Sequence, residues 1–487
     1  MLPNVQLSQI DGALGIIPPS NGDIQVVLGP STTGPFDTIA AFGSAKYVQQ
    51  NFGLGPLVEN ACYQIEKLGR PVVVIRTKTT GGSDGGYETI DVTGVTGTAT
   101  VTVDATTHPI DEYDAYFIVV HGGTTGSAGI TYQSSLDNGR TLSPVTALGT
   151  ALTIVIPNSN VTFDVDTGKT LVAGDVVKVR TTPPVEGAAD LTDALTALSL
   201  TRQPWDFVNL CSNLGATEAA AVDAWLSGLF NGGKYYWAIG NTRQPATTET
   251  ETTYNTALAA AFSATSSLFL SLAAGYTQLR SAVSSRQYAR PASWALAARA
   301  ASTYIGQDWA EVDLGPLSDA RILDANGNPV AQFHDEEAYP GLDDLRFATL
   351  RSIDGYQGVY NTNPRIIAPT GSDFIFAQFR RVMNVACRVV RAELMRRLSK
   401  QILVNKKTGF ILESEARDIE AGVNTALRTA LLTRPDASDA KFVLSRTDNV
   451  LSTFTLHGDT RIVPLAYPKS VIVTMGFNNP AIRVQAV

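Results

Sequence analysis

The run PVVVIRT at residues 71–77 constrains the fold of this chain more than any other feature. It holds four successive β-branched residues with no polar residue between them, a pattern typical of a strand that is covered on both faces. A helical repeat precedes it, which begins at Gly55-Pro56 and ends at Gly69. The run IQVVLG at residues 24–29 predicts an earlier strand. The order strand, helix, strand predicts a layered α/β core.

The alternation of predicted strands and helices returns after residue 186. Strands are predicted at three apolar segments, WDFVNLCSN (205–213), KYYWAIGN (234–241) and SSLFLSLAAG (266–275). Between the first two, Thr217 can cap a helix that ends at Asn231-Gly232-Gly233. The segment PASWALAARAA (291–301) predicts another helix. The fold class is therefore α/β, with the core built from two separate parts of the sequence.

Residues 81–185 differ from both flanks. This stretch is rich in Thr, Val and Gly and shows no helical periodicity. Four segments read as strands, with Asp137-Asn138-Gly139 at a turn: TATVTVD, AYFIVVHG, ITYQSSLDNGRTLS and ALTIVIP. Two prolines follow the last strand pattern. The sequence thus predicts an all-β domain inserted into the α/β core.

The C-terminal part predicts two helices, at about residues 373–403 and 413–432, and three strands, KFVLSRTDN, RIVPLAYP and KSVIVTMGF. Between Arg380 and Lys407 there are nine Lys or Arg and one Glu, a local charge of +8 in a chain whose net charge is −8. At 100° per residue, Arg380, Arg381, Arg388 and Arg391 share one stripe of the first helix, and apolar residues hold much of the rest.

Three interpretations of this basic helix are open: a solvated face with partners in the same chain, a nucleic-acid backbone, or an acidic protein surface. The acidic remainder of the chain and the lack of aromatic residues among the arginines weigh against nucleic acid. An acidic protein partner is compatible with both observations.

Both ends of the chain read as extended arms. Near the start, Val5 and Leu7 alternate with polar residues, and Gly and Pro then exclude a helix. At the other end, Ile482 and Val484 alternate with Arg483 and Gln485. Neither end has an adjacent hairpin partner in the sequence.

Motifs of catalysis and cofactor binding are missing from the sequence. It has no GxSxG elbow and no phosphate-binding GxxxxGK[ST] loop. Its four histidines are not spaced as metal ligands. We therefore expect no catalytic residue, no metal and no cofactor. With no signal peptide and no long apolar stretch, we also expect no membrane insertion. The acidic cluster at His334–Glu337, with Asp343 and Asp344, is predicted to lie on a solvated loop.

In order along most of the chain, several segments resemble the tail sheath proteins of contractile phages and related injection machines. The insertion contributes YQSSLDNGRT and LVAGDVVKVRTTPP. The other segments are GPFDTIAAFGSAKYVQQNFGLGPLVENACYQIEKLGRPVVVIRT, RQYARPASWALAARAASTYIGQDWAEV, FRRVMNVACRVVRAELMRRLSKQILVNKKTGF and RIVPLAYPKSVIVTMGFNNPAI.

Together with this resemblance, the patterns divide the chain into six parts. They are an N-terminal arm (1–22), the first part of the α/β core (23–80), an outward-facing β-domain (81–185), an α/β middle domain (186–345), a tube-facing domain with the basic helix (346–467), and a C-terminal strand and arm (468–487).

The resemblance implies a structural subunit that polymerises as stacked hexameric rings around an inner tail tube. It implies contraction without nucleotide hydrolysis, with baseplate and tail terminator proteins as further partners. The expected location is the sheath of a virion assembled in the bacterial cytoplasm. On this reading Arg380, Arg381, Arg388 and Arg391 are candidates to face an acidic tube.

The arms, at Val5, Leu7, Ile482 and Val484, would join subunits by strand addition. Candidate hinges are Gly12, Gly15, Gly476 and Pro480, which are equally compatible with ordinary turns. Two other functions are open. One is a carbohydrate-binding or adhesive surface protein, which needs an exposed aromatic platform in residues 81–185. The other is a hydrolase at the acidic cluster, which needs raised carboxyl pKa values.

Overall fold

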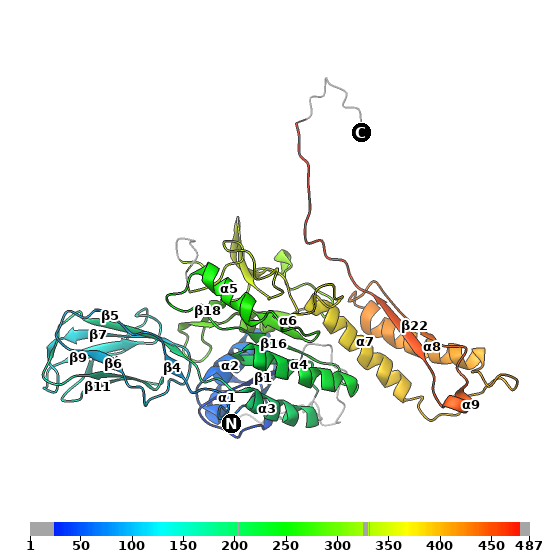
Figure 1. The fold of residues 1–487 in the computed structure, drawn as a ribbon, viewed down its shortest axis with the longest axis horizontal. Coiled ribbons are helices and arrows are strands. Elements are labelled where there is room, and N and C mark those ends of the chain that lie inside the picture. Colours follow the sequence, from blue (N-terminus) through cyan, green and yellow to red (C-terminus); the bar gives the residue numbers. More distant parts are fainter. Residues whose placement is uncertain (1–23, 202–203, 325–329, 331, 478–487) are drawn as a thin grey trace, which may run out of the picture.

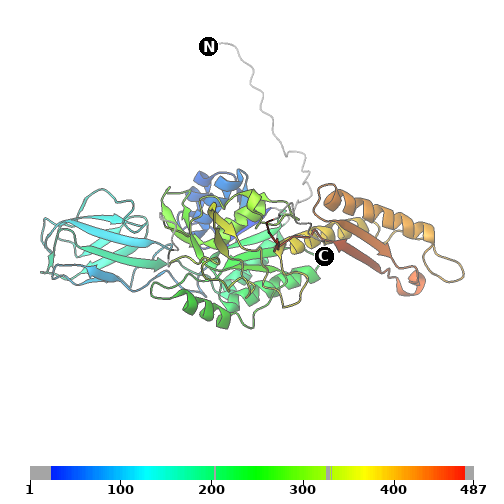
Figure 2. The same ribbon diagram turned by 90° about the horizontal axis from the view of Figure 1, so that it is seen from above.

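The structure is a computed structural model, and it describes residues 24–201, 204–324, 330 and 332–477. The described chain is elongated (Figures 1 and 2). The β-rich insertion lies at one end, an α/β body in the middle, and the C-terminal helices and hairpin at the other end. Residues 1–22, with Val5, Leu7, Gly12 and Gly15, lie outside the described residues.

A six-stranded sheet forms the centre of the body, in the order β17-β16-β15-β1-β3-β2. Neighbouring strands are parallel except β2, which runs antiparallel to β3 at one edge. The strands are β1 (Gln25–Gly29), β2 (Ile39–Phe42), β3 (Val72–Arg76), β15 (Phe207–Asn213), β16 (Trp237–Asn241) and β17 (Leu270–Ala273). The buried runs predicted from the sequence thus lie side by side, although residues 77–206 separate two of them.

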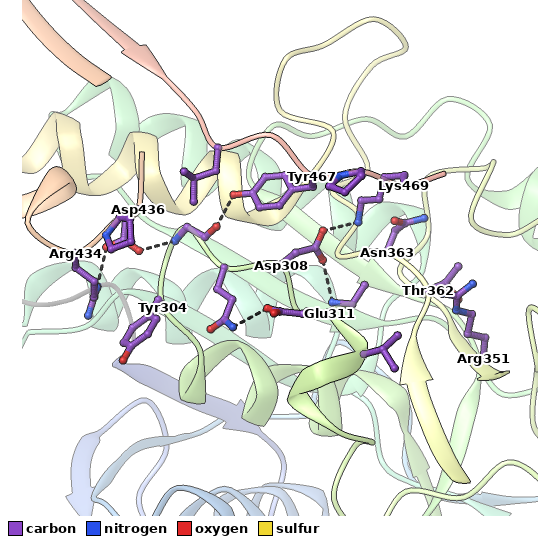
Figure 3. Close-up of a pocket in the computed structure, with 17 residues that line it drawn as sticks. Tyr304, Asp308, Glu311, Arg351, Thr362, Asn363, Arg434, Asp436, Tyr467 and Lys469 are labelled. Atoms are coloured by element: carbon purple, nitrogen blue, oxygen red, sulfur yellow. Dashed lines mark hydrogen bonds and ion pairs between the residues drawn. The ribbon is translucent and has the colours of Figure 1, made fainter. Parts of the chain in front are cut away.

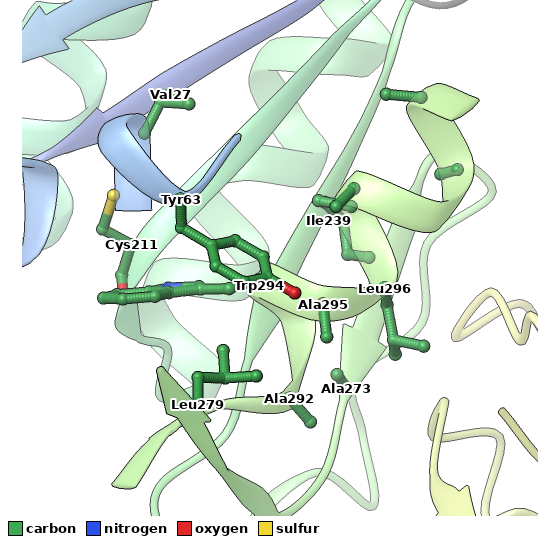
Figure 4. Packing of buried hydrophobic residues seen from close by; sticks show 14 of the residues in the cluster. Val27, Tyr63, Cys211, Ile239, Ala273, Leu279, Ala292, Trp294, Ala295 and Leu296 are labelled. Carbon is green, nitrogen blue, oxygen red and sulfur yellow. The ribbon is translucent and has the colours of Figure 1, made fainter. Parts of the chain in front are cut away.

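Helices cover both faces of this sheet, as the unbroken apolar strands require. On one face, α2 (Pro56–Leu68) and α6 (Ala292–Ser302) pack together with Trp294 and Tyr63 (Figure 4). The other face is covered by α3 (Ala188–Leu200), α4 (Ala216–Asn231) and α5 (Glu251–Ala261). A short helix, α1 (Ala45–Phe52), precedes α2. The class is mixed α/β.

Several helices of the body differ from the sequence prediction, and α5 was not predicted at all. The helix expected to begin with Thr217 as its cap instead has Gly215 as N-cap, because the Glu218 carboxylate accepts a hydrogen bond from the Gly215 amide at 3.2 Å. The helix α3 was not predicted. The buried apolar residues of α3 are Leu191, Ala194, Leu195 and Leu198. Their spacing is helical, so the signal was present in the sequence.

The insertion is built from strands, with no helix among its described residues 81–185. One sheet has the order β10-β9-β7-β14-β4, with β5 also paired to β14, and another has the order β11-β12-β6. Its strands are β4 (Gly86–Tyr87), β5 (Asp91–Gly94), β6 (Val101–Val103), β7 (Asp114–His121), β8 (Gly123–Thr124), β9 (Thr131–Ser135), β10 (Thr146–Ala147), β11 (Thr153–Ile156), β12 (Val161–Val165), β13 (Thr170–Leu171) and β14 (Val176–Thr182).

The sheets of the insertion enclose their own apolar core, in which the rings of Phe117 and Phe163 meet edge to face at 5.1 Å. The predicted turn follows β9, where Asn138 and Gly139 both have positive φ values of 57° and 79°.

The C-terminal unit packs two helices against a hairpin. The basic helix α7 (Ala377–Met395) is shorter than predicted, and α8 (Glu413–Leu427) continues as a π-turn to Leu432. The hairpin is β22 (Asp439–Leu444) with β23 (Gly458–Val463), joined through the short helix α9 (Val450–Thr453). The strand predicted for KSVIVTMGF is not formed: residues 471–477 pair with no strand within the described chain. The remaining elements are β18 (Tyr276–Arg280), β19 (Gln287–Pro291), β20 (Leu350–Ile353), β21 (Tyr356–Asn361) and the 3-10 turn Val312–Leu314.

A neck of buried charges attaches the insertion to the body. Its centre is Arg290 on β19, which donates hydrogen bonds to the Asp111 carboxylate at 3.0 Å and to the Glu112 carbonyl at 2.6 Å. Glu59 on α2 adds a third buried carboxyl beside it. The two linkers of the insertion run together here, because Ser83 and Val185 exchange backbone hydrogen bonds of 2.9 and 2.8 Å.

The single charge of Arg290 does not neutralise the three buried carboxyl groups of Asp111, Glu112 and Glu59. Burial raises the pKa of Glu59 to about 7, although Arg290 acts in the opposite direction. Burial likewise raises the pKa of Glu112 to about 8, against the effect of Arg290 and Arg180. Burial also raises the pKa of Asp111. The neck therefore holds protonated carboxyls at neutral pH.

We predict that alkaline pH destabilises the neck. Because the folded-state pKa values lie above those of exposed carboxyls, the stabilising contribution is complete in acid and is lost as the pH rises through about 7 to 8. Between pH 7 and 9 the melting temperature should fall by about 1 °C through Glu112 alone, because a chain of 487 residues loses about 1.4 kcal/mol of stability. Calorimetry of Glu112→Gln, which cannot ionise, should show a smaller fall. An identical fall in both proteins would contradict this account.

Candidate functional site

Helix α7 does not expose all the arginines of its predicted stripe. Arg380 is 2% exposed, and its guanidinium lies 4.8 to 5.1 Å from the ring centroids of Phe230, Phe269 and Phe374. Burial lowers its pKa to about 10. The prediction of a surface cation at this position is wrong, because cation–π contacts with three rings take the place of solvent.

Arg381 is also buried, at 1% exposure. It donates hydrogen bonds to the carbonyls of Ala300, Thr303 and Tyr304 at 2.9 to 3.2 Å. These carbonyls lie at the C-terminal end of α6, where the chain leaves main-chain acceptors without helical partners. Arg381 therefore attaches α7 to the body. The prediction that it is a surface cation is also wrong.

The other two arginines of the stripe lie farther along α7. Arg388 is half-buried and forms an ion pair with the buried Asp206. Arg391 is exposed. Beyond it, exposed cations continue around the end of the helix and into the following loop. We call this set the basic tip: Arg391, Arg396, Lys400, Lys406 and Lys407.

The basic tip lies at the end of the molecule farthest from the insertion (Figures 1 and 2). Arg396 pairs with Glu393 on the same helix at 2.8 Å. Among the described residues, no ion pair involves Lys400, Lys406 or Lys407. The local excess of positive charge inferred from the sequence is thus exposed at the end of α7, not along its length.

The C-terminal segment at residues 471–477 is extended, and nearly all of its apolar surface is in solvent. Ile472 is 93% exposed and Met475 is 89% exposed. Val471, Val473 and Phe477 are exposed as well. A run of this composition is the kind that pairs with another strand when one is available. Gly476 lies within it, and Pro480, Ile482 and Val484 lie outside the described residues.

The hairpin beside α7 has one free edge. On β22, Asn424 and Glu420 of α8 bind the outward main chain: the amide of Phe442 donates to Asn424 Oδ1 at 2.7 Å and that of Leu444 to Glu420 Oε1 at 2.7 Å. In an antiparallel pair the outward groups alternate with the pairing groups. On β23 they therefore belong to Gly458, Thr460 and Ile462, and within the described chain no strand covers them.

An apolar groove runs next to this free edge. Its volume is about 340 Å³, and Thr460 of β23 forms one wall. The other lining residues are Tyr235 and a row from α7 and the turn after it: Met383, Ala386, Cys387, Val390, Arg391, Leu394, Met395 and Leu398. A strand added to β23 would place alternate side chains over this groove.

A larger cavity of about 680 Å³ lies where the C-terminal segment leaves the body (Figure 3). The Tyr467 hydroxyl donates to the Gly306 carbonyl, and Lys469 pairs with Asp308. The Gly306 amide donates to Asp436 at 3.0 Å. These carboxylates are each engaged by cations or amides, so the arrangement anchors the chain.

Most of the acidic cluster at His334 is buried, so the predicted solvated loop is wrong for His334, Asp335, Glu336 and Asp343, whereas Glu337 and Asp344 are exposed. His334 lies between Glu251 and Glu336, at 2.9 Å from each. Burial acts to lower the pKa of His334, but the two carboxylates raise it to about 9. Burial acts to raise the pKa of Glu336, yet hydrogen bonds from His334 and two backbone amides lower it overall. The hydrolase hypothesis requires raised carboxyl pKa values here, so it loses its basis.

The insertion offers no aromatic platform among its described residues. Tyr113 and Tyr132 are buried in its core. Tyr116 packs beneath the turn at Gly139, and Tyr87 binds the Thr107 hydroxyl at 3.0 Å. The carbohydrate-binding hypothesis thus lacks the surface that it requires.

Among the residues that the structure describes, no group of three or more His, Cys, Asp or Glu is arranged to hold a metal ion. None of the helices described is both long enough and apolar enough to cross a bilayer.

Comparison with solved structures identifies the fold. A chain of the anti-feeding prophage (AFP) baseplate superposes with a TM-score of 0.51 at 10% identity, covering 98% of this chain and 99% of that one. The sheath tail protein Lin1278 of Listeria innocua gives 0.44 at 14% identity, covering 91% and 96%. The sheath tail protein DSY3957 of Desulfitobacterium hafniense gives 0.45 at 11% identity, covering 95% and 100%. The resemblance identified from the sequence is confirmed at the level of the fold by the match to the AFP chain.

Comparison of sequences identifies the family. No curated protein matches the chain. The family model described as DUF2586, N-terminal domain, matches residues 2–365, which include the α/β body and the insertion. The chain therefore belongs to the DUF2586 family.

Proposed function

We propose that this chain is the subunit of a contractile sheath. It would polymerise as stacked hexameric rings around an inner tube and drive the tube through the envelope of the target cell. Two observations carry the proposal: the exposed apolar segment at residues 471–477, and a hairpin edge on β23 that no strand of the described chain covers. Within the described residues neither the segment nor the edge has a partner strand, so each is suited to pair with another copy.

In this proposal the C-terminal segment of one copy adds to β23 of another. Its main chain binds the outward groups of Gly458, Thr460 and Ile462, and its apolar side chains fill the groove along α7. Burying side chains such as Ile472 and Phe477 stabilises the contact by about 1.5–3 kcal/mol each. At the other end of the chain, Val5 and Leu7 are proposed to add a strand in the same way, and Ile482 and Val484 to extend the C-terminal one.

Main-chain pairing suits a polymer that changes its lattice. Such bonds join neighbours with little dependence on the exact side chains, so an arm can stay paired while the bodies rotate. We propose Gly12, Gly15, Gly476 and Pro480 as the hinges of this movement. Contraction would then proceed without nucleotide hydrolysis, from an extended lattice trapped by assembly on the tube to one that buries more surface.

The basic tip is proposed to face the tube. It lies at the opposite end from the insertion, so one end of the subunit can contact an acidic tube while the other points outward. Of the four arginines selected from the sequence, Arg388 and Arg391 remain candidates for this contact. Exposed charge pairs are weak and are screened by salt, which allows release during contraction.

The remaining parts of the proposal concern the machine around the sheath. The baseplate would trigger contraction, and a tail terminator would end the polymer. The subunits would assemble in the bacterial cytoplasm and reside in the tail of the particle. Neither nucleic acid nor a cofactor has a role in this account.

We predict that proline at Ile462 abolishes polymerisation. The Ile462 amide points away from β22, so proline removes a bond to an incoming strand and leaves the hairpin's own bonds intact. Electron microscopy of Ile462→Pro, with the inner tube protein as template, should show no cylinders, whereas Ile462→Ala should assemble. In the same assay Ile472→Asp should abolish cylinders. The control Leu451→Asp, which also places a charge at an exposed apolar residue, should leave them intact. Normal cylinders from Ile462→Pro would contradict strand addition at this edge.

We predict that reversing charge at the basic tip weakens tube binding without affecting the arms. Lys400→Glu, Lys406→Glu and Lys407→Glu together should reduce co-sedimentation with the tube protein by about tenfold, if each contact contributes about 0.5 kcal/mol. The loss should grow smaller as salt rises, because screening weakens the native contact. Lys169→Glu with Lys178→Glu, on the insertion, is the matched control. If the tip variant binds the tube as well as the unchanged chain does, the basic tip is not the tube contact.

A further inference from the structure

The chain close to each end of the described residues is tied to the same helix. Ile24, the first described residue, and Lys469, which precedes the C-terminal segment, each bind an aspartate that also binds α7. We infer that Asp206 and Asp308 are coupling residues that transmit movement between the arms and α7. The inference rests on the proposed function, which gives the arms their task, and it adds the residues through which the arms act on the body.

The N-terminal connection is made by Asp206, just before β15. Its Oδ2 accepts a hydrogen bond from the Ile24 amide at 2.9 Å, and its own amide donates to the Ile24 carbonyl at 2.8 Å. Its Oδ1 accepts from Arg388 of α7. One buried carboxylate thus joins the start of the described chain to the middle of the basic helix.

The C-terminal connection is made by Asp308 (Figure 3). Its Oδ2 accepts from Lys469 and, at 3.3 Å, from the buried Gln378 in the first turn of α7. The Lys469 ammonium also lies 4.8 Å from the ring centroid of Phe376, and the Tyr467 ring lies 5.8 Å from that of Phe379. The root of the C-terminal segment is therefore held against the beginning of the same helix.

Sharing a carboxylate makes each contact depend on the other. Asp206 is 1% exposed and Asp308 is 8% exposed. If α7 moved away from Asp206, the carboxylate would lose its ion pair with Arg388 in a site with little water, which is unfavourable. The hydrogen bond between Asp206 and Ile24 would then be altered as well. A movement of either arm is thus transmitted to α7, the helix that carries the basic tip.

The coupling would give a sheath a direct connection between neighbours and tube. Strand addition links a copy's arms to other copies, and the coupling residues link those arms to α7. Movement of one subunit could then shift the basic tip of the next without any change in the α/β sheet. The direct pairs of Arg388 and Lys469 with these aspartates are the parts of this path that substitution can remove.

The test is amide hydrogen exchange of the full-length monomer, read by mass spectrometry. Arg388→Gln, a change on the helix, should raise exchange at the arm root, in peptides that contain Ile24 to Gly29. Lys469→Met, a change at the other arm root, should raise exchange in the first turn of α7, around Gln378. Each rise should be about tenfold, as the loss of one charge-assisted hydrogen bond predicts.

Three controls make the result decisive. Arg396→Gln changes an arginine of the same helix whose side chain is 73% exposed, and it should alter neither peptide. Arg388→Lys keeps the charge and should restore part of the protection. If Arg388→Gln fails to fold, Asp206→Asn keeps the side-chain shape and should raise exchange at both Ile24 and Arg388.

Folded variants with unchanged exchange at the distant peptides would overturn the inference. The measurement uses the monomer, so it is independent of polymerisation. A chain that forms no cylinders would contradict the proposed function and leave the coupling result standing.

Discussion

The arginine that joins α7 to the body determines what the rest of the C-terminal part can do. Arg381 binds the carbonyls at the end of α6, and Arg380 is enclosed by three aromatic rings. These contacts fix the first half of α7 at one angle. The C-terminal end of α7, which leads into most of the basic tip, extends beyond the body (Figure 1). A side chain that the sequence presents as a surface charge thus provides the attachment of the helix.

The second constraint is that a segment and a strand edge lack a pairing partner among the described residues. Within that part of the chain, the extended segment at 471–477 has no partner strand and β23 has a free edge in a two-stranded sheet. Natural proteins usually protect free edges and do not expose long apolar strands. Both features in one chain are costly for a monomer and useful for a polymer. The body, by contrast, is complete: helices cover both faces of its sheet.

Much of the fold was predictable from the sequence because its strands are buried on both faces. The runs at Val72–Arg76 and Gln25–Gly29 have the composition that a parallel central sheet requires. The helix-free composition of residues 81–185 likewise predicted an insertion made of strands. The helix α3 was missed although its leucines are spaced as a helix requires. The candidate site was less predictable. Helical spacing places Arg380 and Arg381 on one stripe, but it does not say which element covers that stripe.

The acidic cluster at His334 shows the same limit. Its composition predicts exposure, yet Glu251, distant in sequence, gives His334 a second carboxylate and makes burial favourable. Only the tertiary arrangement reveals such partners. An extended arm is easier to predict from the sequence, because its pattern does not depend on a partner elsewhere in the chain.

The most direct test of the account is a cryo-electron microscopy structure of the assembled polymer at a resolution that traces the main chain. The account predicts that residues 471–477 of one copy form a strand along Gly458–Val463 of another, with their apolar side chains in the groove of α7. A polymer in which this segment pairs with nothing, or in which β23 keeps a free edge, would contradict it.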